Sequence, residues 1–515
     1  MSNENQQIST SALTTVIASS SVGTLIEWYD FYIFGSLAKE ISVQFFPSEN
    51  PTAAFLSTLA TFAAGFIVRP FGALFFGRLG DMIGRKYTFL VTLLVMGLAT
   101  FAIGFIPSYK TIGALAPALV LLLRLLQGLA IGGEYGGAAT YVAEHAPANQ
   151  RGFWTSWIQI TATIGLFVSL MVILACRSSM SKESFADWGW RVPFWLSIIM
   201  VGISVVIRLK MNESPLFAKL KSEGKTSKNP LKESFGKKEN LKMVLLALFG
   251  ATAGQGVIWY TSQFYVMNFI KGTCAVESAQ AETWLGIGLL CATPFFIIFA
   301  TLSDKIGRKW IMLAGMLLAV LTFKPIFKQI RDLTNPQNKT EIKESIIVAA
   351  PILTADVKMP TDSILKTDTT RIYADGTKAR KVTELIIFAD ANKRATAKPK
   401  VTNIVTLGES NKWSLVGWIF LLVLYVTMAY GPIAAFLVEL FPTQIRYTSM
   451  SLPYHIGNGI FGGLVPFIGL LLVENSKTTA LPNGDIYAGL NYPIGVIALC
   501  LIIGIFFLPN KVVEE

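Results

Sequence analysis

Long runs of apolar, almost uncharged residues recur along nearly the whole chain and limit what it can fold into. At a rise of about 1.5 Å per residue, helices of this length cross most or all of a hydrocarbon core about 30 Å thick. Only 15% of the 515 residues are charged, against about 25% in soluble proteins. The sequence therefore predicts an all-α polytopic membrane protein with twelve transmembrane helices. The twelve runs have 17 to 28 residues and lie at 12–38, 53–77, 87–107, 113–137, 154–176, 193–209, 243–270, 282–302, 310–328, 413–437, 452–474 and 491–509.

Lysine and arginine are distributed unevenly between the two sides of these runs. If the N-terminus is cytoplasmic, the short cytoplasmic loops and the tail hold 19 basic residues, ten of them within 208–242, and the opposite loops hold 7. Basic residues accumulate in the cytoplasmic loops of membrane proteins. We therefore expect a multi-pass protein of a bacterial inner membrane with both termini in the cytoplasm. The same distribution explains the net charge of +12 without a nucleic acid partner.

Two long polar segments interrupt the apolar runs and divide the chain. The first is rich in lysine with interspersed glutamate, which is typical of a solvated cytoplasmic linker. It separates six runs from six. The expected units are an N-terminal six-helix bundle at 1–210, the linker at 211–242, three helices of a C-terminal bundle at 243–330, an inserted domain at 331–412, and the last three helices with the tail at 413–515.

The second polar segment, 331–412, falls on the extracytoplasmic side in this topology. It contains short β-branched runs at 345–348 and 385–388, separated by turn signals that include Asp375-Gly376. Such runs between turns are typical of strands. We therefore predict a small, β-rich extracytoplasmic domain inserted into an otherwise helical protein.

Two motifs occur once in each half of the chain. The motif D-x-x-G-R-K begins at Asp81 and again at Asp304, 223 residues later. The motif E-x-x-P-x-x-x-R begins at Glu144 and again at Glu439, 295 residues later. The segment 331–412 accounts for the 72-residue difference between the two offsets. The halves therefore repeat each other, and the inserted domain is not part of the repeat.

Duplicated six-helix halves are the architecture of alternating-access transporters, in which a site near the midplane lies between two bundles that rock about it. At this point the motifs carry a family resemblance. GRLGDMIGRK at 77–86 resembles the signature loop of the major facilitator superfamily, and RLLQG at 124–128 resembles its R-x-x-Q-G element. The likeness covers nearly the whole chain outside the inserted segment. More narrowly, the chain resembles the metabolite:H⁺ symporter family in EWYDFY at 27–32, GGEYGG at 132–137 and GQGVIWY at 254–260.

The resemblance implies secondary active transport, by proton-coupled symport of a small organic solute. Members of this family take up α-ketoglutarate, citrate, shikimate, proline or betaine with protons. The expected partners are protons, the solute and the lipid bilayer, and the protein is expected to be a monomer without cofactor or metal. Two alternatives stay open, namely an antiporter or exporter on the same fold and a transporter-like receptor that senses a ligand through 331–412.

An enzyme is not expected from this sequence. The chain has two histidines and contains no G-x-S-x-G, H-E-x-x-H or Walker A motif. Its four cysteines are far apart and form no metal-binding or disulfide pattern. These observations exclude the common hydrolases and metalloproteases, and they argue against pumping driven by ATP.

The repeated loops are predicted to form a latch on the cytoplasmic side. Their acidic and basic residues stand between two runs, where they can pair with carboxylates and helix ends of neighbouring spans and break those pairs on opening. A purely topological role would explain the basic residues but not the spacing that is used twice. The candidate latch residues are Asp81, Arg85, Lys86, Glu144, Arg151, Asp304, Arg308, Lys309, Glu439 and Arg446.

Ionisable residues inside the runs are few and costly to bury, which makes them functional candidates. Glu27 and Asp30 share one face of the first run, and Glu134 lies in the fourth. Arg124, halfway along the fourth run, keeps its charge and must face a carboxylate, a water-filled cavity or an anionic substrate. We expect Asp30 to carry the proton, with Glu134 next, and Glu27 and Arg124 to take part. Static ion pairs that only hold helices together are the alternative.

A polar stripe in the seventh run is the predicted substrate face. Gln255, Trp259 and Gln263 follow one another at four-residue spacing. Amide groups suit a small polar or zwitterionic ligand, aromatic faces suit a quaternary ammonium, and arginine suits a carboxylate. Anions, zwitterions and neutral polyols therefore stay open as substrates. The predicted substrate-binding residues are Arg69, Arg124, Gln255, Trp259, Tyr260, Gln263 and Asn458.

Both histidines and a group of glycines give weaker signals. His455 stands near the cytoplasmic start of its run, where an exposed or capping role is as well supported as proton transfer, and His145 is placed in a loop. Glycines in the fourth run form a small-residue face on which another helix can approach closely, either to slide or to pack statically. They are Gly128, Gly132, Gly133, Gly136 and Gly137.

Overall fold

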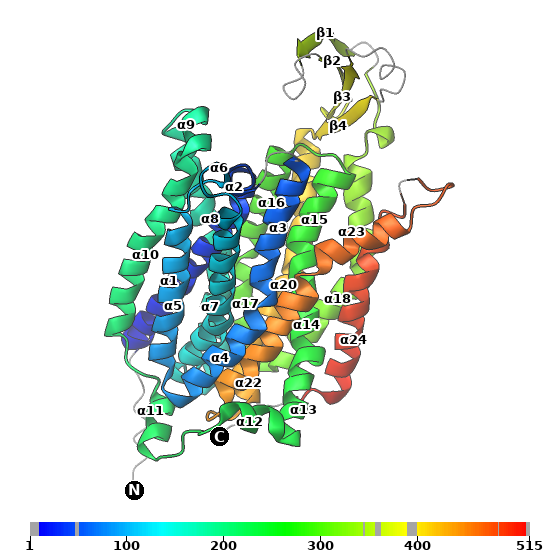
Figure 1. Ribbon diagram of the computed structural model, residues 1–515. Helices are drawn as coiled ribbons and strands as arrows, with labels where there is room; N and C mark the ends of the chain where they lie inside the picture. Colours follow the sequence, from blue (N-terminus) through cyan, green and yellow to red (C-terminus); the bar gives the residue numbers. More distant parts are fainter. Residues whose placement is uncertain are drawn as a thin grey trace.

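Helices standing side by side in one bundle make up most of the protein, with a small sheet at one end (Figure 1). The computed structural model describes residues 10–46, 51–342, 346–355, 362–388, 399–482 and 484–510. Among these residues, eleven helical segments are long and apolar enough to cross a membrane. Together with α1 (Thr10–Ser36), they coincide with the twelve predicted runs, so the polytopic helical fold is confirmed. Ser345 in a predicted strand and Lys511 in the predicted tail lie outside the described residues, as do the first nine residues.

The first half contains the first six predicted spans. The second span is divided into two helices that meet at Val68. Helix α1 packs against α8 and α10, and α7 packs against α3, α4 and α5. The helices after α1 are α2 (Ala38–Phe45), α3 (Pro51–Ile67), α4 (Arg69–Met82), α5 (Arg85–Ile103), α6 (Tyr109–Ile112), α7 (Leu115–His145), α8 (Arg151–Ser178), α9 (Lys182–Asp187) and α10 (Val192–Lys210).

The second half repeats this arrangement with more irregular helices. Its α-helices are α13 (Lys238–Ala247), α14 (Ala253–Tyr260), α15 (Val266–Asn268), α16 (Ser278–Ala292), α17 (Pro294–Ile306), α18 (Arg308–Thr334), α20 (Glu409–Tyr430), α21 (Ile433–Leu440), α22 (Arg446–His455), α23 (Val465–Asn475) and α24 (Asn491–Phe507). Short π-helical segments join several of them, namely η3 (Leu248–Thr252), η4 (Thr261–Tyr265), η5 (Phe269–Thr273) and η8 (Ile456–Gly462). A π turn widens the helix, so residues four apart no longer share a face there.

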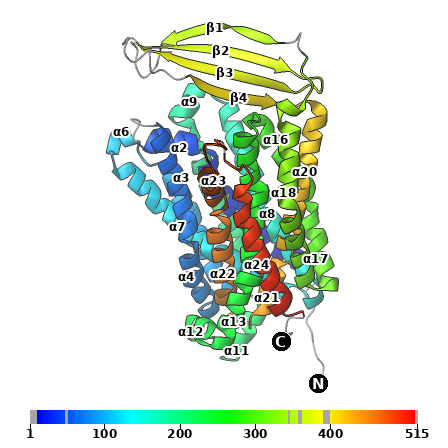
Figure 2. The ribbon, with the colours of Figure 1, turned by 90° about the vertical axis from the view of Figure 1, so that its right-hand side faces the viewer.

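The sheet is a four-stranded antiparallel meander in the order β1-β2-β3-β4 (Figure 2). Its strands are β1 (Ile347–Ala355), β2 (Ser363–Ile372), β3 (Lys378–Ile387) and β4 (Lys400–Thr406). The predicted strands are confirmed, and Gly376, with a φ of 79°, lies in the predicted turn between β2 and β3. Strand β4 joins the bundle by hydrogen bonds from the Val405 amide to the Ala275 carbonyl (2.7 Å) and from the Glu277 amide to the Val405 carbonyl (2.9 Å). The flanking helices α18 and α20 reach further than predicted, to Thr334 and from Glu409.

The linker forms α11 (Pro215–Ser222) and α12 (Pro230–Gly236), which lie across the end of the bundle opposite the sheet (Figures 1 and 2). We call this end the linker side. Helix α1 begins there and α24 ends there. Helix α11 contacts α7 of the first half, and α12 contacts both α4 of the first half and α22 of the second. The linker therefore spans the seam between the halves.

The halves approach each other most closely where α22 packs on α4 and α7. A Cβ atom added at Gly136 would overlap the Ser451 hydroxyl, and one added at Gly80 would overlap the ring of Tyr447. By contrast, a Cβ at Gly132 would meet the backbone of α4 within the first half. The predicted small-residue face thus packs against two partners, because some of its glycines admit a helix of the same half and others admit a helix of the opposite half.

Replacing Gly136 by valine should separate the halves on the linker side, because the new side chain occupies the space of Ser451. We expect a cysteine at buried Ser449, in a protein whose four native cysteines are replaced by serine, to react with a maleimide several-fold faster in this variant. The matched control is Gly202→Val, since no atom lies within 4 Å of a Cβ added at Gly202. Equal labelling rates in the Gly136 and Gly202 variants would contradict the role of this contact.

Candidate functional site

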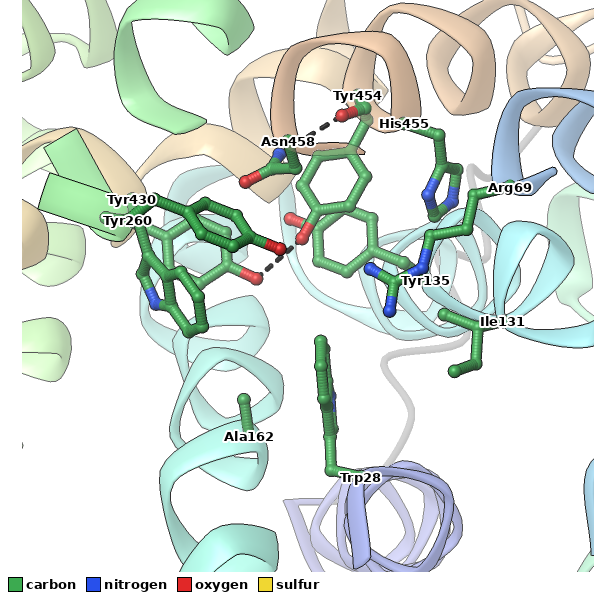
Figure 3. Close-up of a pocket in the computed structure, with 11 residues that line it drawn as sticks. Trp28, Arg69, Ile131, Tyr135, Ala162, Tyr260, Tyr430, Tyr454, His455 and Asn458 are labelled. Atoms are coloured by element: carbon green, nitrogen blue, oxygen red, sulfur yellow. Dashed lines mark hydrogen bonds between the residues drawn. The ribbon is translucent and has the colours of Figure 1, made fainter. Parts of the chain in front are cut away.

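A cavity lies between the two halves (Figure 3). Helices α1, α4, α7 and α8 contribute to its wall from the first half, and α14, α20, α22 and η8 contribute from the second. A site shared by two bundles changes shape when the bundles move relative to each other. The lining residues are Trp28, Arg69, Ile131, Tyr135, Ala162, Trp259, Tyr260, Tyr430, Tyr454, His455 and Asn458.

Arg69 is the one permanently charged side chain among the described residues that line the cavity. Its guanidinium carbon lies 4.6 Å from the ring centre of Phe31 and 4.3 Å from that of Phe66. Nε and Nη2 are buried without a hydrogen-bond partner, and the ion pairs of the described residues do not include Arg69. Figure 3 shows this guanidinium pointing between Trp28 and the tyrosines. A buried, unpaired cation is costly, so an anionic group of a ligand would stabilise it.

Tyrosines from both halves meet across the cavity. The rings of Tyr135 and Tyr454 are stacked with their centres 3.5 Å apart. The hydroxyl groups of Tyr430 and Tyr454 are hydrogen-bonded at 2.6 Å, and Gln159 Nε2 donates to the Tyr135 hydroxyl at 2.8 Å. The second half thus presents hydroxyl groups opposite Arg69 of the first half. Sequence reasoning missed these tyrosines, because buried aromatic residues in apolar spans resemble ordinary packing residues.

The predicted polar stripe of the seventh span is only partly present. Trp259, Tyr260 and Asn458 line the cavity as expected. Gln255 lies behind the wall, where its amide exchanges hydrogen bonds of 3.2 and 3.0 Å with the Asn458 amide. Gln263 does not line the cavity, because it falls in the π-helical segment η4, which shifts the helix face after Tyr260.

Arg124 lies behind the cavity wall. Its guanidinium carbon is 4.5 to 4.9 Å from three phenyl rings, those of Phe31, Phe34 and Phe62. Nη1 donates to Gln127 Oε1 at 2.6 Å, and Gln127 Nε2 donates to Thr100 at 2.7 Å. The sequence predicted a carboxylate, a water-filled cavity or a substrate beside Arg124. The described structure instead gives this cation an amide and aromatic faces.

Asp30 is fully buried on the side of α1 that faces α10. One of its oxygens accepts a hydrogen bond of 2.6 Å from the Ser197 hydroxyl, and the other has no partner. No cation among the described residues forms an ion pair with it. Asp30 and Glu27, predicted to act from one helix face, therefore have different surroundings.

Glu27 and Glu134 share one cation, Arg208. Arg208 Nη2 lies 3.2 Å from Glu27 Oε1 and 2.9 Å from Glu134 Oε1, and all three side chains are buried. The hydroxyl groups of Thr24 and Thr92 also donate to Glu134, at 3.3 and 3.1 Å. The distribution of basic residues predicts Arg208 to lie in a cytoplasmic loop, and this prediction is wrong. Arg208 is near the end of α10, and its side chain extends into the bundle, where it also donates to the Phe89 carbonyl.

The first copy of the repeated loop holds the halves together on the linker side. The Asp81 carboxylate accepts hydrogen bonds from the amide (2.8 Å) and hydroxyl (2.7 Å) of Thr448, in the first turn of α22. Arg85 pairs with Asp81 at 3.1 Å and with Glu144 at 3.5 Å, and Glu144 also pairs with Arg446 of the second half at 3.2 Å. A carboxylate at a helix N-terminus satisfies amides that have no partner within the helix.

The second copy makes the same contact in the opposite direction. The Asp304 carboxylate accepts hydrogen bonds from the amides of Gly152 (2.8 Å) and Phe153 (2.9 Å), in the first turn of α8. Arg308 pairs with Asp304 at 2.5 Å and with Glu439 at 2.8 Å. Each half therefore caps a helix of the other half, which explains why the two motifs recur with matching spacing.

The remaining latch candidates make other contacts. Lys86 donates to the carbonyl of Leu209 at 3.0 Å, near the end of α10. Lys309 donates to the carbonyls of Ile505 and Leu508 at 2.9 and 2.8 Å, near the end of α24. Both lysines thus bind the C-terminal ends of helices, where a cation is favourable. Arg151 makes no ion pair within the described residues, although it was predicted to belong to the latch.

The start of the linker is a latch component that sequence reasoning missed. The Glu213 carboxylate accepts hydrogen bonds from the amides of Arg85 (3.1 Å) and Lys86 (3.4 Å), in the first turn of α5. The Ser214 hydroxyl donates to Glu144. Ser214 followed by proline is a recognisable helix start. That signal gives the position of α11 but not its contact with a loop about 130 residues earlier in the chain.

Both histidines are more buried than predicted. His455 has an exposed fraction of 2% and lines the cavity beside Arg69, instead of capping a helix at the surface. His145 is the last residue of α7 rather than a loop residue, and its Nδ1 lies 2.7 Å from the Tyr141 carbonyl. His455 was predicted near the start of its run, where a shift of a few residues changes a surface position into a buried one. His145 was predicted in a loop because the fourth run was expected to end at 137, whereas α7 continues to His145.

Removing Arg208 should strongly destabilise the protein, because Glu27 and Glu134 would stay buried side by side without a cation. We expect Arg208→Gln to lower the free energy of unfolding by about 3 to 5 kcal/mol. Unfolding of the purified protein in detergent measures this loss, and adding Glu27→Gln should recover much of it. The control Arg177→Gln removes an exposed pair with Glu40 and should cost less than about 1 kcal/mol. Similar losses for both arginines would contradict a structural role of the buried triad.

Comparisons with known proteins agree with this architecture. Residues 15–244 match the family model described as "Sugar (and other) transporter". The chain is 32% identical over 466 residues to the inner membrane metabolite transport protein YhjE of Escherichia coli K12, covering 89% of this chain and 88% of the relative. It is 34% identical over 323 residues to the α-ketoglutarate permease of the same strain, covering 62% of this chain and 72% of the permease.

A solved structure has the same fold. The proton:xylose symporter XylE bound to 6-bromo-6-deoxy-D-glucose matches with a TM-score of 0.66, covering 98% of this chain and 97% of XylE at 15% identity. The two bundles, the repeated latch and the shared cavity thus occur on a known transporter fold. The chain belongs to the major facilitator superfamily, in the metabolite:H⁺ symporter family that its motifs indicate, and it is a transporter and not an enzyme.

Proposed function

We propose that this transporter takes up a small organic carboxylate together with protons, by alternating access across a bacterial inner membrane. The observation that carries the proposal is the unpaired guanidinium of Arg69 in a cavity without an acidic residue among its described lining. Arginine binds carboxylates through two parallel hydrogen bonds. The name of the α-ketoglutarate permease, one of the relatives, supports the same substrate class.

The cavity also favours a carboxylate over a quaternary ammonium. Aromatic rings of Trp28, Tyr260 and Tyr454 would attract a cationic group. A ligand with a cation alone would, however, lie close to the Arg69 charge without a compensating carboxylate. A zwitterion such as proline or betaine can satisfy both features. We therefore rank carboxylates first and zwitterions second, and a purely cationic solute is not expected.

The charges within the first half support coupling to protons. Apart from the latch residues on the linker side, three arginines and three carboxylic acids are buried there, and they balance each other if all are ionised. A bound carboxylate adds a negative charge that is costly in the membrane interior, and a proton taken up with it restores the balance. The six side chains are those of Arg69, Arg124, Arg208, Glu27, Asp30 and Glu134.

Asp30 remains the proposed proton carrier. Glu134 has a cation and two hydroxyl donors that stabilise its charged form, and Glu27 shares the same cation. Asp30 has a hydroxyl donor but no cation among the described residues. Protonation of Asp30 therefore neutralises a buried charge that has no ionic partner. Protonation of Glu134 would instead break its ion pair with Arg208.

We assign the linker side to the cytoplasm, with both termini, on the basis of its excess of basic residues. The inserted segment 331–412 then lies outside the membrane. Its sheet meets the bundle at β4 and α16, and it contributes no described residue to the cavity lining. An accessory role is therefore favoured over ligand sensing. On this assignment the cytoplasmic gate is closed in the structure, and opening requires the Asp81 and Asp304 contacts to break together.

Arg69→Gln should abolish most carboxylate transport. A hydrogen bond to a charged group contributes about 1.5 to 3 kcal/mol, so uptake at low solute concentration should fall roughly tenfold or more. Uptake of radiolabelled α-ketoglutarate, shikimate, proline and betaine into proteoliposomes measures this effect and identifies the substrate. Arg69→Lys keeps the charge and should retain part of the uptake. Unchanged carboxylate uptake in Arg69→Gln would refute the assigned binding role.

Asp30→Asn should separate solute exchange from proton-driven accumulation. An inward proton gradient should drive uptake by the wild-type protein, and a protonophore should abolish it. We expect the variant to exchange solute across the membrane at equilibrium but not to accumulate it. Asp187→Asn, at the exposed end of α9, serves as the control. Accumulation driven by an outward proton gradient would indicate an antiporter, and full gradient-driven uptake by Asp30→Asn would move the proton site elsewhere.

A further inference from the structure

Helices α13 and α24 lie close to each other near the linker side (Figures 1 and 2). Side chains of α13, η3 and α24 line a groove between them. The groove is open to the outside of the bundle, and its walls are almost entirely apolar. Neither the solute cavity nor the latch contains any of its residues. The lining residues are Lys238, Leu241, Lys242, Leu245, Leu246, Phe249 and Ile503.

The shape of the groove follows from a close helix crossing at one end. A Cβ atom at Gly504 would lie 2.9 Å from the carbonyl oxygen of Gly250, so α24 and η3 touch backbone to backbone at that level. Phe249 and Ile503, which border the groove, directly precede these two glycines. Towards the linker side the residues have larger side chains. The helices are therefore held together at the crossing and leave a channel beyond it.

Two lysines stand at the mouth of this groove. Lys238 and Lys242 are one helical turn apart on α13, and neither belongs to an ion pair among the described residues. Leu241 and Leu245 follow the same face with exposed fractions of 36% and 46%. Glu239 lies about 100° around the helix from Lys238. A positive mouth above an apolar channel, at the level where a span enters the membrane, matches a lipid with a charged headgroup.

We propose that the groove binds one anionic phospholipid of the linker-side leaflet, with its phosphate between Lys238 and Lys242 and an acyl chain along Leu245, Phe249 and Ile503. Basic residues close to a membrane surface attract anionic lipids. The site adjoins the gate, because α13 packs on α22 and the preceding α12 is bonded to α22 through the hydroxyl groups of Ser234 and Ser449 (2.8 Å). The proposal does not depend on which solute is transported.

Native mass spectrometry of the purified full-length protein in neutral detergent tests the site. The protein is titrated with phosphatidylglycerol or phosphatidylcholine, and bound lipids are counted. We expect phosphatidylglycerol to bind more tightly. Lys238→Gln with Lys242→Gln should weaken its binding about tenfold, and Leu245→Trp, which fills the channel without changing the charge, should weaken it as well. The matched control is Lys219→Gln with Lys221→Gln on α11, which removes the same charge elsewhere on the linker.

Three results would overturn the proposal. Equal binding of the two lipids by the wild-type protein would exclude selection by charge. Equal losses in the groove and control lysine variants would indicate general attraction to the basic linker. Loss with the lysine variant but not with Leu245→Trp would indicate a surface phosphate site without a chain in the groove. Displacement by soluble glycerol phosphate is a further test. This molecule has the phosphate but no acyl chain, so at an equal concentration it should not displace a lipid whose chain lies in the groove.

Discussion

Two carboxylates that cap helices of the opposite half join the two halves on the linker side, where we propose the cytoplasmic gate. Helices α8 and α22 begin at the seam between the bundles, and their first amides cannot find partners within the helix. Asp81 supplies acceptors for α22, and Asp304 supplies them for α8. Because each acceptor comes from the other half, these amides are satisfied only while the halves are together on this side. Opening must therefore expose the helix ends to water, which makes the gate a two-state element.

Charge balance in the membrane constrains the first half in a similar way. Apart from the latch residues, its buried arginines and acids are equal in number, but they are not all paired. Arg208 holds Glu27 and Glu134 in one network, whereas Arg69, Arg124 and Asp30 are left without ionic partners among the described residues. The unpaired Arg69 at the cavity can bind one external anion, and the unpaired Asp30 behind it can bind one proton. Charge balance therefore links the binding of the two ligands in the proposed symport.

The sequence predicts the fold better than it predicts the site. Spans and strands follow from apolar runs and β-branched segments. The duplicated motifs draw attention to Asp81 and Asp304, but they do not show that each carboxylate accepts hydrogen bonds from the first turn of a helix in the opposite half. Neither the apolar runs nor the motifs could reveal the buried role of Arg208, since a basic residue at the end of a span is also expected in a cytoplasmic loop. Gln263 was assigned to the cavity because a π turn leaves no trace in spacing. Tyr135 and Tyr454 belong to different halves, and the residue pattern along the sequence does not show that their rings are in contact.

Helix α22 connects the cavity to the gate. Thr448, in its first turn, is capped by Asp81, and Tyr454, near its end, stacks on Tyr135 and bonds to Tyr430 in the cavity. The two positions are six residues apart, or about 9 Å along one helix. A ligand that draws Tyr454 towards Arg69 acts on the same helix that carries the cap. Pro453, directly before Tyr454, and the π-helical η8 after His455 interrupt regular hydrogen bonding at the cavity end of α22, so the helix can turn there while its first turns move as a unit.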